Sequence, residues 1–140
     1  MFDLVQWGVS ETDPNFAEEL RERLEDVLTA FASAIAEGVP NVMWRVDQPK
    51  SVIYEFVAVV TFAKHSNPRD ELVGVSVECR DRHSGWTIDA IDLEAMPIFE
   101  VPLHECNEID MSSPKAAASG IQVILGRLSD RVVSELSSAA

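Results

Sequence analysis

Seven carboxylates follow one another in the second half of the chain without a lysine or arginine among them. Arg82 precedes this run and Lys115 follows it. The seven residues are Asp89, Asp92, Glu94, Glu100, Glu105, Glu108 and Asp110. Carboxylates without counter-charges create a negative potential that speeds association with basic proteins. We therefore expect this run to form a partner-binding acidic surface, with plain solvation of an acidic protein as the alternative.

The whole chain is negatively charged, as this run of carboxylates is. Its 140 residues contain 11 Lys and Arg against 24 Asp and Glu, a formal net charge of −13. Phosphate backbones and anionic membrane surfaces would be repelled by such a charge. We expect a protein partner of basic character, no nucleic acid and no membrane.

Histidine and cysteine supply ligand types suited to zinc, at positions 65, 79, 83, 104 and 106. None of them stands at Cys-x2-Cys, His-x3-His or His-Glu-x-x-His spacing. The acids Asp89, Asp92 and Glu94 lack the oxygen spacing and the glycine of a calcium loop. We expect no metal and no cofactor.

A thiolate–imidazole pair is the catalytic arrangement that the sequence offers. His104 and Cys106 would share one side of a strand, and a hairpin would bring Cys79 near His83. Cys79 falls in phase with core valines, which indicates an inert buried thiol. Carboxylates around Cys106 are expected to raise its pKa. We therefore assign no catalytic residue, and a small enzyme with a dispersed His/carboxylate pocket remains an alternative.

Two amphipathic helices are expected to frame the elements that position these residues. Asp13-Pro14 is typical of a helix start and Gly38 of a helix end, which predicts a helix over about 14–37. Ser113-Pro114 repeats the start signal. The apolar stripe that follows contains Ile121, Ile124, Leu125, Leu128, Val132 and Leu136.

Period-two patterns between the helices predict strands. They cover 42–46, 52–63, 73–80 and 86–93, with a loop over 64–70 and a tight turn over 82–85. Ile98, Phe99, Val101 and Leu103 are candidates for a fifth, edge strand. Because the links are short, we expect an antiparallel meander.

The predicted fold class is α+β. One antiparallel sheet of four to six strands would be flanked by an N-terminal and a C-terminal amphipathic helix, in a single domain over 1–140. The N-terminal segment, with Phe2, Leu4, Val5 and Trp7, is too apolar for a free tail and would dock on the sheet or in an interface.

Size, charge and the lack of a catalytic motif favour a protein-binding function. The chain shows no basic leader, no apolar run long enough for a membrane span and no disulfide framework, so we expect a cytoplasmic protein. Immunity proteins that neutralise toxic enzymes share this profile, as do acidic secretion chaperones; the likeness is one of composition alone. An immunity-type inhibitor of a basic toxin or effector enzyme is the leading hypothesis. A secretion-chaperone-like or self-associating structural protein, including a homodimer, is the alternative.

Overall fold

One long helix precedes the strands in the chain and another follows them. Both were predicted from apolar residues at three- and four-residue spacing. The computed structural model describes residues 16–47, 56–79, 86–92 and 96–139. Helix α1 spans Phe16–Gly38 and helix α3 spans Pro114–Ala139. Ser113 Oγ accepts a hydrogen bond from the Ala116 N–H at 3.0 Å, so Ser113 is the N-cap of α3. The predicted cap at 13–14 lies outside the described residues.

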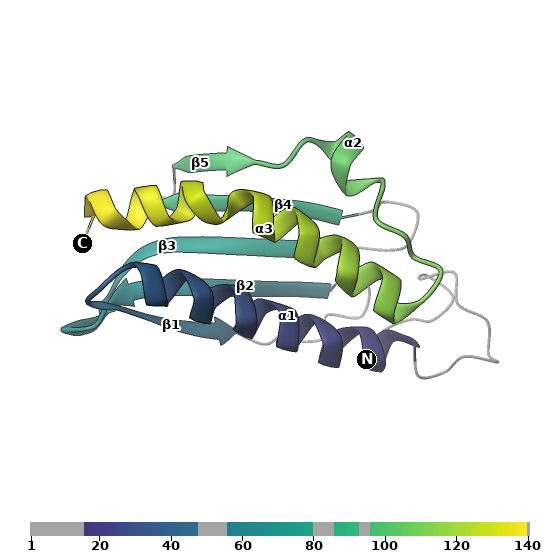
Figure 1. The fold of residues 1–140 in the computed structure, drawn as a ribbon, viewed down its shortest axis with the longest axis horizontal. Helices are drawn as coiled ribbons and strands as arrows, with labels where there is room; N and C mark the ends of the chain where they lie inside the picture. Colours follow the sequence, from purple (N-terminus) through teal and green to yellow (C-terminus); the bar gives the residue numbers. More distant parts are fainter. Residues whose placement is uncertain (1–15, 48–55, 80–85, 93–95, 140) are drawn as a thin grey trace.

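Five strands form one antiparallel sheet in the order β1-β2-β3-β4-β5, which confirms the predicted meander. The strands are β1 (Val42–Asp47), β2 (Phe56–Lys64), β3 (Asn67–Cys79), β4 (Trp86–Asp92) and β5 (Pro97–Glu100). A short helix, α2 (Leu103–Cys106), follows β5 at the edge of the molecule (Figure 1). Each strand lies beside its neighbour in the sequence, because the connecting segments contain too few residues for a crossover.

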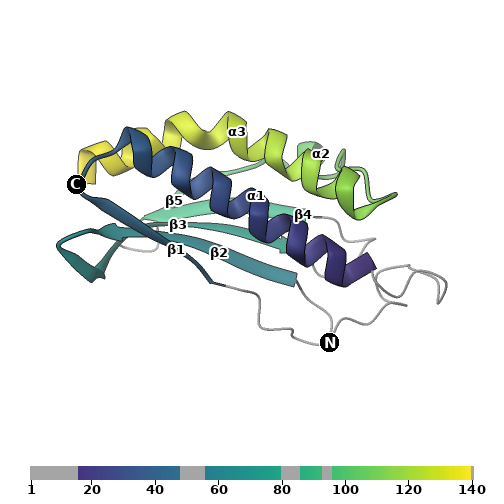
Figure 2. The same cartoon turned by 60° about the horizontal axis from the view of Figure 1, so that its bottom comes forward.

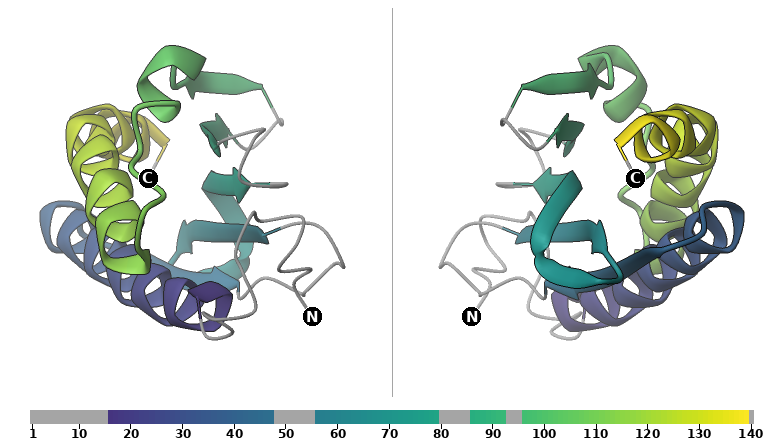
Figure 3. Two further views of the ribbon diagram at one scale, coloured as in Figure 1. Left: turned by 90° about the vertical axis from the view of Figure 1, so that its right-hand side faces the viewer. Right: turned by 90° about the vertical axis from the view of Figure 1, so that its left-hand side faces the viewer.

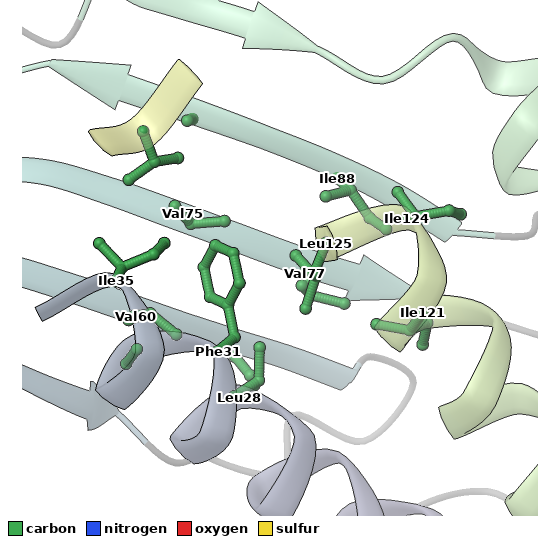
Figure 4. Packing of buried hydrophobic residues seen from close by; sticks show 14 of the residues in the cluster. Leu28, Phe31, Ile35, Val60, Val75, Val77, Ile88, Ile121, Ile124 and Leu125 are labelled. Atoms are coloured by element: carbon green, nitrogen blue, oxygen red, sulfur yellow. The ribbon is translucent and has the colours of Figure 1, made fainter. Parts of the chain in front are cut away.

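Both long helices lie on the same face of the sheet (Figures 2 and 3). The hydrophobic core fills the space between this pair of helices and the sheet. Figure 4 shows Phe31 and Ile35 of α1 and Leu125 of α3 directed toward the valines of β2 and β3. Burial of each such side chain contributes about 1.5–3 kcal/mol to the free energy of folding. Trp86 is also buried, and its indole N–H donates to Met111 Sδ at 3.1 Å.

The opposite face of the sheet carries the alternate residues of each strand. Among the described elements no helix or strand covers this face, which we call the helix-free face (Figure 2). Val60 and Phe62 of β2 are fully buried under the helices, whereas Val57 and Val59 are half-buried on the helix-free face. The even and odd positions of one strand therefore occupy two different environments, as the pleat requires.

The segment predicted as a loop over 64–70 belongs mostly to a hairpin, so that prediction is wrong. Strand β2 continues to Lys64 and β3 already begins at Asn67, which leaves a two-residue turn. An ion pair between Lys64 Nζ and Asp70 Oδ2 at 3.2 Å joins the two strands. Backbone pairing and this ion pair together outweigh the weak strand preference of the polar residues.

The fifth strand is shorter than predicted. It ends at Glu100, and Leu103 lies in α2 with 60% of its surface exposed. The N–H groups of Glu105 and Cys106 donate to the Pro102 carbonyl at 3.0 and 3.3 Å. Pro102 cannot donate to a strand ladder, and the chain turns into a helix after it.

Candidate functional site

Two of the predicted acids meet on the helix-free face, where β4 pairs with β5. Ile88 and Ala90 are buried under the helices, so Asp89 between them points to the other side. Glu100 is the direct cross-strand partner of Asp89. Burial raises the pKa of the Asp89 carboxyl above its usual range, and the negative charge of Glu100 raises it further.

Strand β5, which carries Glu100, is held from the helix side. Arg131 of α3 donates to the Ile98 carbonyl oxygen at 3.0 Å, and its guanidinium lies 5.5 Å from the centre of the Phe99 ring. Phe99 is buried toward the helices, so Glu100 next to it points outward. The fold therefore fixes two carboxylates side by side.

Asp92 stands at the end of β4, close to the first two acids in the sequence. Its Oδ1 accepts a hydrogen bond from the Met96 N–H at 3.0 Å. The same residue lines a hollow of about 380 Å³ on the helix-free face. Asp92 is nevertheless in phase with the buried Ile88 and Ala90, and it also lines a groove with residues of α3, so it does not extend the Asp89–Glu100 pair on the helix-free face.

The remaining described acids of the run lie elsewhere. Glu105 Oε1 is 3.5 Å from Arg127 Nη1 of α3, and Glu108 lines a groove between α2 and α3. Asp110 Oδ1 accepts a hydrogen bond from the Ser112 N–H at 2.9 Å in the link to α3. The run is thus divided between the sheet and the helix layer. Glu94 lies outside the described residues.

The strand register places one further acid, Asp47 at the far edge of the sheet, in the same row as Asp89 and Glu100. Asp47, Val59, Ser76, Asp89 and Glu100 are successive cross-strand partners on one face. The sequence reasoning did not select Asp47, although its place in the period-two pattern of β1 puts it on the outward side. The pairing of distant strands was the missing information, because it cannot be read from one strand alone.

The next row of cross-strand partners forms the floor of the hollow. It contains Thr61, Gly74 and Ile91, with Arg45 at its β1 end. Arg45 Nη2 is 2.5 Å from Glu71 Oε1, and Arg45 Nε is 3.5 Å from Asp47 Oδ2, so two carboxylates neutralise this cation. A glycine inside a strand is a recognised signal for a close approach, and Gly74 offered that signal in the sequence.

The thiol and imidazole considered for catalysis do not meet. Cys106 is 1% exposed and His104 is exposed, because two residues apart on a helix point in different directions. The expectation that they share one side of a strand is therefore wrong. Burial raises the pKa of the Cys106 thiol, a backbone hydrogen bond with Ile88 lowers it, and the charge of Glu105 raises it. The rise agrees with the prediction, but burial is its main cause. The side chains of Cys79 and His83 lie outside the described residues.

Comparison with protein-family models, with curated proteins and with solved structures finds no match for this chain. Within the described ranges no group of three or more His, Cys, Asp or Glu side chains is placed to hold a metal ion. The same ranges contain no helix long and apolar enough to cross a membrane.

Proposed function

We propose that this chain is an acidic protein-binding domain of the cytoplasm, and that it acts as an immunity-type inhibitor of a basic toxin or effector enzyme. The observation that supports the proposal is the Asp89–Glu100 carboxylate pair on the helix-free face. Cationic side chains of a partner would lie against these two acids and balance their charge.

Repulsion between the Asp89 and Glu100 carboxylates favours binding of a cation at this pair. Two carboxylates placed directly opposite each other on neighbouring strands destabilise a sheet. Burial raises the pKa of Asp89, and the repulsion from Glu100 raises it further. A lysine or arginine of a partner would relieve the repulsion on binding, and no described helix or strand lies over this face of the sheet.

Self-association through the same face is disfavoured by its charge. In a symmetric dimer each patch meets its own copy, so the Asp89 and Glu100 carboxylates of two chains would approach one another. A net charge of −13 adds a long-range repulsion. Sedimentation equilibrium tests this point directly: a stable dimer that buries the helix-free face would contradict the proposal.

The decisive experiment compares two double variants that lose the same charge. Asp89→Asn/Glu100→Gln removes the pair, and Glu22→Gln/Glu25→Gln removes two exposed acids from the outer side of α1. The tagged full chain first captures its partner by crosslinking in cells, and the purified partner is then titrated calorimetrically.

We expect Asp89→Asn/Glu100→Gln to raise Kd by about tenfold or more, since hydrogen bonds to charged groups contribute about 1.5–3 kcal/mol to binding. The helix variant should bind like the wild-type chain. Inhibition of the partner's toxic or enzymatic activity should follow the same order. Equal affinities for all three proteins would overturn the proposed role of this face.

A further inference from the structure

The two edges of the sheet differ in how well they are protected. At one edge, β5 is only four residues long and begins with Pro97, which has no N–H to donate. Arg131 of α3 donates to the Ile98 carbonyl oxygen at 3.0 Å and so occupies an acceptor of this strand. A short strand, a proline and a charged side chain at the edge all oppose pairing with a further strand.

The opposite edge is formed by β1, which pairs with β2 and with no other described strand (Figure 1). The Asn41 carbonyl accepts a hydrogen bond from the His65 N–H at 2.8 Å, in the register that continues along β1 and β2. Antiparallel strands alternate between pairs that exchange such bonds and pairs that do not. The odd-numbered residues of β1 therefore bond β2, and the even-numbered ones direct N–H and C=O groups to the free edge. These are Val42, Trp44 and Val46.

The side chains of these three residues lie on the helix side of the sheet. Trp44 and Val46 are cross-strand partners of Phe62 and Val60, which are fully buried under the helices. Val42 is buried, whereas Trp44 and Val46 are half-buried and pack against the core. A strand added to β1 would extend the ladder and cover the exposed parts of both side chains.

Strand β1 is complementary to a second copy of itself. When two copies pair antiparallel about Trp44, this residue exchanges hydrogen bonds with Trp44 of the other copy, and Val42 of each exchanges them with Val46 of the other. Every outward N–H and C=O group of these three residues then has a partner. A pairing centred on Val42 or Val46 would leave part of β1 unmatched by the other β1.

The charges of this edge also suit a second copy. Within one chain Arg45 Nε is 3.5 Å from Asp47 Oδ2, and its Nη2 is 2.5 Å from Glu71 Oε1. In the pairing about Trp44, Arg45 would stand opposite Met43 of the other copy and Asp47 opposite Asn41, so no like charges would meet. A basic strand would instead meet the guanidinium of Arg45, so this edge is a poor site for a basic partner.

We propose that the chain forms a two-fold symmetric homodimer through the free edge of β1, which joins the two sheets into one. The helices of both copies would lie on the same side of the joined sheet, because the symmetry axis is perpendicular to it. The Asp89–Glu100 pair is at the β4–β5 end of the sheet and stays outside this interface. The inference therefore does not depend on the proposed function.

Sedimentation equilibrium of the full chain tests the dimer. A contact between two edge strands is small for a stable interface, so we expect reversible association with a Kd on the order of 10 µM, measured from about 1 to 300 µM. Salt should strengthen the dimer by screening the repulsion between two chains of charge −13, whereas salt should weaken binding of a basic partner. A monomer over the whole concentration range would overturn the inference.

Two variants of Met43 separate this edge from the charge of the whole chain. Met43→Arg places a guanidinium opposite Arg45 of the other copy and should raise the dimer Kd by about 2- to 10-fold; Met43→Glu places a carboxylate there and should lower it by a similar factor. Net charge alone predicts the opposite order, since Met43→Glu makes the chain more negative. That opposite order would contradict pairing about Trp44.

Removal of one outward N–H tests the backbone contact. Val46→Pro loses a donor that faces the free edge and leaves the bonds to β2 intact, so it should raise the dimer Kd by at least about tenfold. Val46→Thr keeps the N–H and should dimerise like the wild-type chain. An unchanged Kd in Val46→Pro would overturn the inference.

Hydrogen exchange of the wild-type chain provides a measurement that needs no variant. The Trp44 and Val46 amides should exchange more slowly as the protein concentration rises, because the second copy accepts their hydrogen bonds. The Arg45 amide bonds β2 and should exchange slowly at every concentration. A dimer that leaves the Trp44 amide as fast as in the monomer would be formed elsewhere and would contradict the proposal.

Discussion

Neutralising Asp89 should stabilise the free protein. Asp89 lies directly opposite Glu100 on the adjacent strand, and both its burial and the charge of Glu100 raise its pKa. Like charges in such pairs cost about 0.2–1 kcal/mol, and partial exposure to solvent and salt places the cost in the lower part of that range. We expect Asp89→Asn to raise the free energy of unfolding by about 0.5 kcal/mol at neutral pH.

The pH dependence of this gain follows from the direction of the pKa shift. The carboxyl of Asp89 holds its proton to a higher pH in the folded than in the unfolded chain, so the folded state binds more protons between the two pKa values. Stability therefore falls as pH rises through this window, which begins at the ordinary value of 3.8 and extends upward. The gain from Asp89→Asn should be full above the window and disappear below it.

Urea denaturation at a series of pH values measures this effect. Glu100→Gln should give a similar gain, and the double variant should gain less than the sum of the two, because either change removes the same repulsion. A loss of stability in Asp89→Asn at neutral pH would refute the reasoning. So would a gain that is as large at low pH as at neutral pH.

Three further changes test the packing and the caps. Phe62→Ala empties the fully buried centre of β2 and should lower the free energy of unfolding by about 3–5 kcal/mol in urea titrations; a loss below about 1 kcal/mol would contradict the core assignment. Ser113→Ala removes the oxygen that caps α3 at the Ala116 N–H and should cost about 1 kcal/mol by thermal circular dichroism; Ser113→Asp, a good cap, is the control. In a Cys79→Ser background, Ellman's reagent should label Cys106 only as fast as the protein unfolds, since burial raises the pKa of this thiol; rapid labelling of the folded chain would disprove its burial.

The periodic spacing of apolar residues was enough to predict most of the helices and strands. The stripe through Leu24, Leu28 and Ile35 required a helix with one buried side, and Val73, Val75 and Val77 required a strand with one buried face. Short connections then left a meander as the simplest arrangement. These features depend on neighbours within a few residues, which is the range that sequence patterns report.

The errors lie where contacts between distant segments decide the structure. The hairpin over residues 64–70 is extended because two strands pair, despite its polar composition. Leu103 continued the apolar alternation of a strand, yet Pro102 accepts the hydrogen bonds that begin α2. Local patterns cannot represent either effect.

The candidate site was located in part. Asp89 and Glu100 belong to the predicted acidic run and lie side by side on the helix-free face, whereas Glu105 is bound to Arg127 of α3. Continuity in the sequence did not imply a continuous surface, because the chain leaves the sheet after β5. The hollow itself combines residues of three strands, and only the register brings them together.

The salt dependence of association tests the role of the Asp89–Glu100 pair most directly. Stopped-flow association rates with the purified partner, measured from low to high salt, should fall steeply for the wild-type chain and for Glu22→Gln/Glu25→Gln. For Asp89→Asn/Glu100→Gln we expect a slower rate at low salt and a shallower slope. Identical slopes for the two double variants would show that only net charge matters, and would contradict a specific acidic site on the helix-free face.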